Sequence, residues 1–250
     1  MRRLLNNKQL SISNKFTKVK KDNIVILSDS LSLPRSDDST IITLEQSYPF
    51  LLQQKIGNNF NIINRGIRFT TTNSLVDFQY LFDNLIIYSP RRVIVQMGIV
   101  DCAPRLFSSF FRKLINRIKN EKIRNTIILP FKKNRKFFTK YFKIRMVSKS
   151  SFKKNIQQFL RTMKNLNIDV TLVNIPYTNK KNSNKSYGFN ESIKDYNNLI
   201  LDLKKDNKFH LIDINKESIS QRILVDDGIH YNKNGCNIVA NMLYESITKS

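Results

Sequence analysis

The chain has few cysteines, and this shortage already excludes several classes of protein. Its 250 residues include only Cys102 and Cys236, which are too few for a disulfide framework. We therefore expect two buried thiols in a reducing compartment. Neither cysteine has a metal-ligating partner at a useful spacing. The sequence therefore predicts no metal site and no cofactor.

Long apolar runs are also absent. No stretch of about 18 apolar residues occurs, so we expect no membrane span. Residues 1–22 are basic and polar and lack the apolar region of a secretory signal. We expect them to form a loosely ordered basic lead-in to one domain over residues 23–250. These features predict a cytoplasmic protein, with peripheral membrane association left open.

Acidic residues are scarce. The chain has 43 Lys and Arg against 19 Asp and Glu, which gives a net charge of +24. A nucleic acid, an anionic lipid or an acidic polymer would each match such a charge. However, the lysines are spread among many asparagines and isoleucines, a pattern that an AT-rich genome produces without functional meaning. Both interpretations stay open.

Short apolar runs alternate with segments of helical spacing. The runs end at turn residues and predict buried strands at 23–27, 60–63, 92–97, 169–175 and 209–214. Helical spacing predicts helices at 44–56, 75–85, 107–118, 152–166, 191–203 and 234–247. Such alternation is typical of βαβ units. It predicts an α/β fold, a doubly wound parallel five-stranded sheet in a three-layer α/β/α arrangement.

Chemically useful residues follow the first three predicted strands. Ser30 comes after the first, Gly66 after the second, and Gly98 and Asp101 after the third. Ligands bind at the carboxyl ends of strands in such sheets. These four positions are therefore candidates for one site.

The most informative stretch lies near the C-terminus. Asp227 and His230 are three residues apart on a turn that Gly228 favours, so the carboxylate can reach the imidazole Nδ1. An acid that fixes the tautomer of a histidine is part of a nucleophilic triad. The alternative is a helix N-terminus with capping acids and an exposed His230.

Four segments in this order resemble the conserved blocks of the SGNH (GDSL-type) hydrolase family. They are Leu27-Ser28-Asp29-Ser30-Leu31, the segment at Gly66, Gly98-Ile99-Val100-Asp101, and Asp227-Gly228-Ile229-His230. The resemblance implies a flavodoxin-like sheet with Ser30 as nucleophile, His230 as general base and then acid, and Asp227 as the orienting carboxylate. It also implies oxyanion donors at the Ser30 and Gly66 backbone N–H groups and at a third-block asparagine.

The third block departs from the family pattern, because Val100 stands where the family has asparagine. Ser28 likewise replaces a glycine. One oxyanion donor is worth about 10²–10³ in rate. Either Arg105 supplies the missing donor, or the reaction differs from ordinary ester hydrolysis, or the site binds without chemistry. The continuation Cys102-Ala103-Pro104-Arg105 resembles SGNH-like proteins linked to bacterial surface-glycan synthesis.

Each candidate residue also has a structural interpretation. Ser30 could end a strand and cap a turn, and Gly66 and Gly98 could serve backbone geometry alone. For Asp101 we expect a structural role, in which its carboxylate accepts backbone N–H groups and holds loops together.

Arginines follow the same strands. Arg35, Arg65, Arg68 and Arg105 would converge on one crevice if the sheet is doubly wound. Guanidinium groups bind carboxylate and phosphate through two hydrogen bonds. They predict an anionic substrate, against the alternative that a basic composition places arginines everywhere.

A basic and aromatic insertion occupies about 120–150, densest at 131–143. It could lie on an anionic membrane or stack on single-stranded nucleic acid. Packing against the domain is the commonest fate of such aromatics and is our prediction. If the insertion has a partner, membrane is preferred over nucleic acid.

The resemblance implies a serine esterase or O-acyltransferase that acts on ester-linked acyl groups of a carbohydrate. The alternative is a non-catalytic binding module for an anionic glycan or another polyanion on a degenerate scaffold. Nucleic-acid binding driven by net charge is a third, less favoured hypothesis. The sequence leaves the acyl group, the acceptor and the oligomeric state undetermined.

Overall fold

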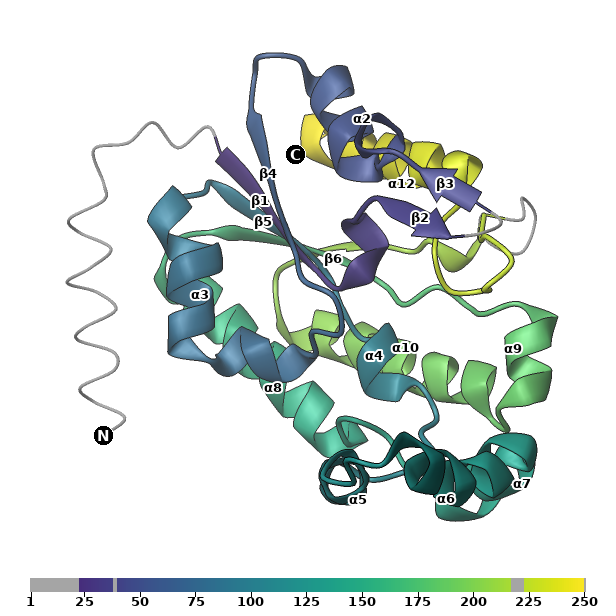
Figure 1. Cartoon of the computed structure of the whole chain (residues 1–250). Coiled ribbons are helices and arrows are strands. Elements are labelled where there is room, and N and C mark those ends of the chain that lie inside the picture. The colour runs from purple at the N-terminus through teal and green to yellow at the C-terminus, as the bar shows by residue number, and fades with distance from the viewer. Residues whose placement is uncertain (1–22, 38–39, 217–222, 250) are drawn as a thin grey trace.

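The structure is a computed structural model that describes residues 23–37, 40–216 and 223–249 (Figure 1). The predicted lead-in, residues 1–22, lies outside these described residues. One parallel sheet of five strands runs in the order β4-β1-β5-β6-β7. The strands are β1 (Asn23–Ser28), β4 (Asn61–Gly66), β5 (Arg92–Gln96), β6 (Asp169–Val173) and β7 (His210–Ile212). The predicted sheet is confirmed.

The sheet is covered on both faces, which explains its continuous apolar strands. Residues 24–27 of β1 are almost fully buried. Helices α2 (Tyr48–Ile56) and α12 (Lys233–Thr248) cover one face, while α3 (Phe78–Asn84), α8 (Lys149–Asn165) and α10 (Phe189–Asp206) cover the other (Figure 1). This is the three-layer arrangement that the alternating pattern predicts.

The chain order of the strands reverses at β1. From β1 the chain crosses to β4 on one side, and it then returns to β5 on the other side. The loops that leave the carboxyl ends of β1 and β5 therefore diverge and leave a crevice between them. Short 3₁₀ and α-helical turns follow these strands: η1 (Ser30–Ser32) after β1 and α4 (Ile99–Cys102) after β5.

Two predicted helices are interrupted by capping residues. The segment 44–56 forms a turn, η2 (Leu44–Gln46), and then α2, with Ser47 between them. The segment 75–85 divides into η3 (Thr72–Val76) and α3 at Asp77, whose carboxylate accepts a hydrogen bond from the Tyr80 N–H at 2.7 Å. Asp77 thus caps α3 through its side chain, whereas Ser47 precedes α2 without a side-chain capping hydrogen bond.

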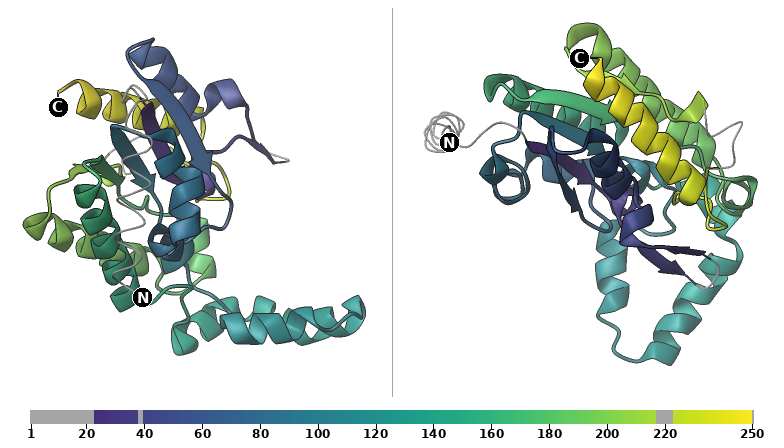
Figure 2. Two further views of the ribbon diagram at one scale, coloured as in Figure 1. Left: turned by 90° about the vertical axis from the view of Figure 1, so that its left-hand side faces the viewer. Right: turned by 90° about the horizontal axis from the view of Figure 1, so that it is seen from above.

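The insertion after α4 is more helical than its pattern indicates. It contains α5 (Ser109–Asn116), α6 (Glu121–Lys133) and α7 (Arg135–Phe142). We name residues 107–143 the arm, because α5 and α6 extend away from the sheet (Figure 2). A bridge between Arg105 and Ile144 joins its two ends, with the Arg105 N–H donating to the Ile144 carbonyl at 3.0 Å.

Four smaller elements complete the description of the fold. Strands β2 (Arg35–Asp37) and β3 (Thr40–Ile42) form an antiparallel pair, η4 (Ile86–Tyr88) follows α3, and α9 (Lys180–Lys185) lies between β6 and α10. Within the described parts of the chain, every helix is too short or too polar to cross a bilayer.

Candidate active site

Ser30 is placed by the turn that ends β1. Asp29 precedes η1, and its Oδ1 accepts a hydrogen bond from the Leu31 N–H at 3.0 Å. This cap tightens the chain into a 3₁₀ turn as soon as the strand leaves the sheet. Ser30 is thereby presented at the carboxyl end of β1.

Ser30, His230 and Asp227 form a continuous chain of hydrogen bonds. The Ser30 Oγ lies 2.7 Å from the His230 Nε2, and the His230 Nδ1 lies 2.6 Å from the Asp227 Oδ2. The first two residues are separated by 200 positions in sequence. A carboxylate at Nδ1 holds the proton there and leaves Nε2 free to accept the hydroxyl proton. This geometry is that of a nucleophilic triad.

Asp227 is held as a carboxylate. Burial alone would raise its pKa, but hydrogen bonds from the His230 ring and from the His230 and Ile229 amides lower the pKa to about 2. Both amides donate to Oδ1, at 3.0 and 2.8 Å. Oδ2 is thus left to the imidazole and stays charged at any physiological pH.

The histidine loop is fixed by the segment that follows β6. The Thr178 hydroxyl donates to the Gly228 carbonyl at 2.6 Å, and the Asn179 amide donates to the Asp226 carbonyl at 3.3 Å. The Asn182 amide donates to the carbonyl of Asp227. We call Thr178, Asn179 and Asn182 the clamp. It holds the loop backbone that positions the acid and the imidazole.

The strand ends are tied to the same loop. The Gln96 amide at the end of β5 donates to the Tyr231 hydroxyl at 2.5 Å, and the Asp29 N–H donates to the Gln96 carbonyl at 3.3 Å. The nucleophile turn and the histidine loop therefore share one anchor in the centre of the sheet.

Arg35 does not face a free substrate position. Its guanidinium lies 3.1 Å from the Asp227 Oδ2, the oxygen that also contacts the imidazole. The structure therefore places this predicted anion ligand against the triad carboxylate.

Two further acids lie beneath the site and are fully buried. Burial raises the pKa of Asp29 to about 7, the Leu31 hydrogen bond lowers it and the charge of Asp101 raises it. Asp101 accepts hydrogen bonds from the Thr72 N–H at 3.0 Å and from its hydroxyl at 2.5 Å. Burial raises the pKa of Asp101 to about 6, against these hydrogen bonds. Asp101 thus joins the loops after β4 and β5, which is the structural role expected for it.

Gly66 is committed to backbone geometry. Its N–H donates to the Asn64 Oδ1 at 3.1 Å, and a Cβ at this position would collide with the Ser32 hydroxyl. Asn64 also contacts Ser32 through both ends of its amide. The glycine is therefore required for the close approach of β4 and η1, and its N–H already has an acceptor, unlike the free donor that the resemblance implies.

Phe69, three residues further on, occupies the position near Ser30. It lies on a turn closed by a 3.3 Å hydrogen bond from the Thr70 N–H to the Ile67 carbonyl, and its φ is 62°. Glycine is the residue that usually adopts such a backbone. Phe69 lines the same pocket as Ser30 and His230, whereas Gly66 is not among the lining residues.

Gly98 is likewise required by geometry. Its φ is 132°, and a Cβ would lie 2.6 Å from the Ile175 Cδ1. The glycine lets the β5–α4 turn pack on the neighbouring β6 loop. Val100, two residues later, lines the pocket with its apolar side chain where the family has a donor.

A cavity of about 350 Å³ opens beside the Ser30 hydroxyl and the His230 ring. Its walls come from α4, the arm, α9 and the start of α10. Of the four arginines predicted to converge here, only Arg105 lines it. Arg65 instead binds the Asn84 side chain at 3.0 Å, and Arg68 binds the Pro34 carbonyl at 3.1 Å. Arg65 lies in β4, where side chains at successive positions point to opposite faces of the sheet, and Arg68 lies in the loop that follows.

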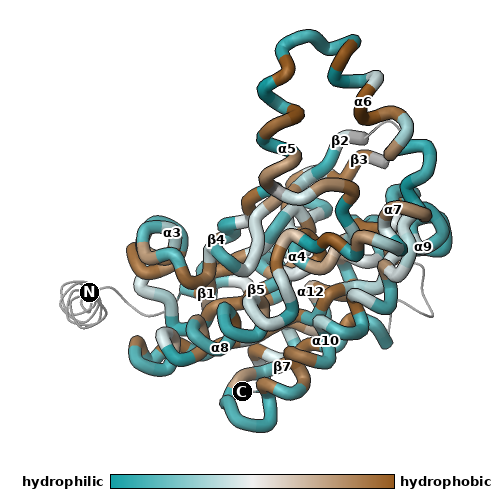
Figure 3. The backbone as a smooth tube through the Cα atoms, turned by 90° about the horizontal axis from the view of Figure 1, so that it is seen from below, coloured by the Kyte–Doolittle hydropathy of each residue, from teal (hydrophilic) through white to brown (hydrophobic). Residues whose placement is uncertain are grey.

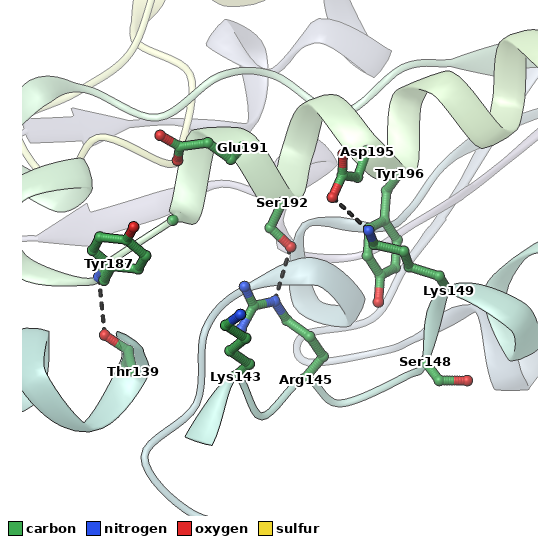
Figure 4. A pocket seen from close by; sticks show the side chains of 11 residues that line it. Thr139, Lys143, Arg145, Ser148, Lys149, Tyr187, Glu191, Ser192, Asp195 and Tyr196 are labelled. Atoms are coloured by element: carbon green, nitrogen blue, oxygen red, sulfur yellow. Dashed lines mark hydrogen bonds and ion pairs between the residues drawn. The ribbon is translucent and has the colours of Figure 1, made fainter. Parts of the chain in front are cut away.

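A second, larger cavity of about 540 Å³ lies between α7, α8 and α10 (Figure 4). Lys149 crosses it to pair with Asp195 at 2.5 Å, and Arg145 donates to the Ser192 hydroxyl at 2.8 Å. None of its lining residues is a histidine, and its Lys149 and Ser192 side chains are engaged by Asp195 and Arg145. The smaller cavity is therefore the candidate active site, and the described residues contain no cluster of three metal-ligating side chains there or elsewhere.

The family of the chain follows from comparison with known proteins. Residues 29–238 match the model of the GDSL-like Lipase/Acylhydrolase family. Because this match spans most of the chain, the protein belongs to that family, whose members are esterases and acylhydrolases. No curated protein matches the chain.

Solved structures agree with the fold. A lipase/acylhydrolase from Enterococcus faecalis is 15% identical with a TM-score of 0.62, covering 90% of this chain and 94% of its own. The acetyl xylan esterase AlAXEase is 17% identical with a TM-score of 0.61, covering 90% and 99%. An acetylxylan esterase from Geobacillus stearothermophilus is 14% identical with a TM-score of 0.59, covering 90% and 94%. At these identities the likeness shows the fold alone.

Several site residues escape sequence reasoning. Arg135 and Lys185 line the cavity from the arm and from α9, and Asn182 of the clamp lies beside them. The sequence pattern gives no reason to select these residues, because it indicates site residues directly after predicted strands and these three follow none. Phe69 differs from them, because it lies only three residues after Gly66 and therefore near the end of a predicted strand.

Proposed function

We propose that the protein is a serine esterase or O-acyltransferase that acts on ester-linked acyl groups of a carbohydrate. The observation that carries this proposal is the hydrogen-bonded chain from Ser30 through His230 to Asp227. Membership of an acylhydrolase family supports the ester bond. The likeness in fold to acetyl xylan esterases supports a carbohydrate ester.

The geometry permits the usual two-step acyl transfer. The Ser30 Oγ attacks the acyl carbon while the His230 Nε2 takes the hydroxyl proton. The same proton then goes to the departing sugar oxygen, which leaves an acyl-serine and a free hydroxyl. Water or a second sugar hydroxyl attacks the acyl-serine, gives its proton to His230 and regenerates Ser30. Asp227 stabilises the imidazolium in both steps.

Oxyanion stabilisation needs a set of donors different from the one that the resemblance implies. The Gly66 N–H is already bound to Asn64. The Phe69 N–H meets no acceptor among the described residues, and we propose it together with the Ser30 N–H as the backbone donors. Arg105 lines the same cavity and has a buried Nε without a partner. We propose its guanidinium as the replacement for the missing asparagine.

Active-site labelling tests the proposal directly. A fluorophosphonate probe should label the wild-type protein at Ser30, and Ser30→Ala should abolish labelling and p-nitrophenyl acetate hydrolysis. Ser74→Ala is a matched control, because this hydroxyl lies in η3 beside Thr70 rather than beside a histidine. A folded wild-type protein that takes no label at Ser30 would contradict the proposal and favour the alternative, a non-catalytic binding module.

Hydrolysis and transfer are distinguished by the products. If the acyl-serine is released to water, an acetylated sugar yields free acetate; if it is released to a sugar, the acetyl group appears on the added acceptor. We also propose surface-glycan synthesis as the context. This part rests on the third-block sequence Gly98 to Arg105 alone.

A further inference from the structure

The cavity beside Ser30 carries positive charge with no acid on its wall. Arg105, Arg135 and Lys185 line it, and none of its lining residues is Asp or Glu. They come from three different segments: the loop after α4, the arm and α9. The fold therefore brings together cations that are up to 80 positions apart in the sequence.

The two arginines are held by neutral groups. The Arg135 Nε donates to the Ser186 hydroxyl at 2.7 Å and its Nη2 donates to the Pro104 carbonyl at 2.9 Å. The Arg105 Nη2 donates to the Val100 carbonyl at 3.1 Å, and its Nε is buried without a partner. Neither guanidinium has an acidic partner within 4.0 Å among the residues that the structure describes.

Two like charges so placed disfavour each other. Burial lowers the pKa of Arg105, and the nearby charges of Arg112 and Arg135 lower it further. Burial also lowers the pKa of Arg135. Partly desolvated cations with no acid in contact are costly unless an anion binds between them. A planar guanidinium fixed at two of its nitrogens still presents donors in a defined direction, which suits an oxyanion group.

We propose that Arg105, Arg135 and Lys185 form an anion subsite that selects esters bearing a second, negatively charged group, a carboxylate or a phosphate, near the scissile bond. This inference rests on the proposed ester chemistry at Ser30. The anion would therefore be bound by residues other than Arg35, Arg65 and Arg68, whose guanidinium groups contact Asp227, Asn84 and the Pro34 carbonyl.

Matched ester pairs test the subsite. On the acyl side, p-nitrophenyl hemisuccinate is compared with p-nitrophenyl butyrate. On the alcohol side, 4-acetoxybenzoate and 4-acetoxyphenyl phosphate are compared with 4-acetoxybenzamide. For at least one pair the anionic member should have a kcat/KM at least about tenfold higher, as expected for a hydrogen bond between charged groups. The pair that responds identifies the side and the chemistry of the anion.

Substitutions then locate the effect. Arg135→Gln and Lys185→Gln should each lower the ratio of anionic to neutral kcat/KM several-fold, and Lys185 is exposed, so its variant should fold normally. Arg161→Gln, an exposed site on α8 outside the cavity, is the matched charge control and should keep the wild-type ratio.

The inference is overturned if the wild-type ratio is near one for every pair, or if both variants keep it. Different results would contradict the proposed function: neutral esters would not be cleaved, and Ser30 would take no fluorophosphonate label.

The arm supports a second inference that is independent of the chemistry. Part of its aromatic content packs within the arm itself: ring centroids of Phe107 and Phe131 are 5.0 Å apart, and those of Phe131 and Phe138 are 4.7 Å apart. These pairs lie inside the arm, whereas the sequence predicts packing against the domain, and they do not account for all the apolar residues of the arm.

Many apolar side chains of the arm face outward. Phe110 is 76% exposed and Tyr141 is 63% exposed, and Leu114, Ile123, Leu129, Phe137 and Phe142 are exposed as well. Figure 3 shows apolar and polar segments alternating along α5 and α6, which extend from the body. Between residues 109 and 143 the only acid is Glu121, among many lysines and arginines.

We infer that the arm docks on an anionic lipid surface. Cations attract anionic headgroups, while exposed aromatic and aliphatic groups enter the interface. Aliphatic side chains such as Ile123 and Leu129 offer nothing on which bases can stack, which disfavours a nucleic acid. The cations alone would fit an anionic membrane and a nucleic acid equally well, so the exposed aliphatic groups decide between them.

Vesicle flotation tests the docking. The full chain should float with vesicles of phosphatidylcholine and phosphatidylserine and should stay unbound to phosphatidylcholine alone. The double variant Phe137→Ser with Tyr141→Ser should lose most of this binding. Leu201→Ser, which removes a 51% exposed side chain from α10, is the control and should still bind.

Three outcomes overturn the second inference. They are no flotation with either vesicle, flotation that the double variant leaves intact, and salt-sensitive binding to single-stranded oligonucleotides that exceeds binding to the anionic vesicles.

Discussion

At the scale of single residues, the site depends on a buried acid that takes no part in the proposed chemistry. Asp29 caps the turn that presents Ser30, but only one of its oxygens is hydrogen-bonded, and Oδ2 is buried without a partner. A carboxyl group in this position is favourable when it is protonated. Its ionised form is buried without full hydrogen bonding, which costs free energy. The nucleophile turn is therefore formed at the expense of stability at neutral pH.

This cost predicts how stability depends on pH. The Asp29 pKa rises from 3.8 to about 7 in the folded state, so its contribution is fully favourable below pH 4 and is lost as the pH rises through 7. From pH 4 to pH 8 the free energy of unfolding of Asp29→Asn should therefore increase relative to that of the wild type, by up to about 4 kcal/mol, because only the wild type has to bury the ionised carboxylate. Urea unfolding at several pH values measures this difference.

The reverse sign holds for Asp227. Its pKa is lowered to about 2, so its stabilisation is present above pH 4 and is lost as the pH falls toward 2. Asp227→Asn is therefore the control, with an effect confined to the acidic side. A wild-type to Asp29→Asn difference that is constant from pH 4 to pH 8 would show that Asp29 does not titrate in this range.

At the scale of elements, two loops that follow different strands form one rigid unit. The clamp after β6 binds the carbonyls of the loop that carries Asp227 and His230. Gly228 makes this possible in two ways, because its φ is 68° and because a Cβ would collide with the Asn179 side chain. The close approach of the Gly228 backbone to the Asn179 side chain thus helps to position Asp227 and His230.

Gly228→Ala tests the clamp. Strain in the left-handed backbone should cost about 1 kcal/mol, and displacement of Asn179 should shift the loop and lower kcat by about tenfold or more. Gly57→Ala is the matched control, since Gly57 has a φ of 63° with open space around it. It should lose stability through backbone strain alone and keep its kcat, which steady-state hydrolysis of p-nitrophenyl acetate measures.

Equal losses of kcat in the two glycine variants would contradict this account. The effect of Gly228→Ala would then come from general destabilisation and not from displacement of the clamp. Thermal unfolding of both variants, measured in the same buffer, distinguishes these cases.

At the scale of the whole molecule, charge acts at two ranges. The net charge of +24 creates a long-range field that accelerates the approach of any anion. The cations of the cavity act only at contact. The two effects differ in their response to salt, because screening shortens the range of the field and leaves direct contacts largely intact.

Ionic strength should therefore separate them. For the anionic ester that the subsite prefers, kcat/KM should fall as salt rises from about 0.01 M to 1 M, where the Debye length falls from about 30 Å to 3 Å. For its neutral partner, kcat/KM should change by less than about twofold. If the anionic ester still has the higher kcat/KM at high salt, and Arg135→Gln removes that difference, the difference is due to direct contact. If kcat/KM depends on salt equally for both esters, long-range steering is excluded.

The sequence by itself determined the architecture, and it singled out the three residues that the structure joins in one hydrogen-bonded chain, Ser30, His230 and Asp227. Apolar runs of strand length can be buried only in a covered sheet, and right-handed crossovers leave few topologies. The ends of those strands must then lie at one edge of the sheet, and the resemblance to the SGNH blocks assigned Ser30, Asp227 and His230 to one site there. The distances of 2.7 and 2.6 Å came only with the fold.

Tertiary structure decided everything that depends on side-chain direction and on segments without periodicity. Arg35, Arg65 and Arg68 follow the right strands, yet their side chains meet Asp227, Asn84 and a backbone carbonyl. The cavity instead takes Arg135 from the arm and Lys185 from α9. Sequence spacing fixes where a strand ends, but only the packing of distant loops fixes which cation stands beside the nucleophile.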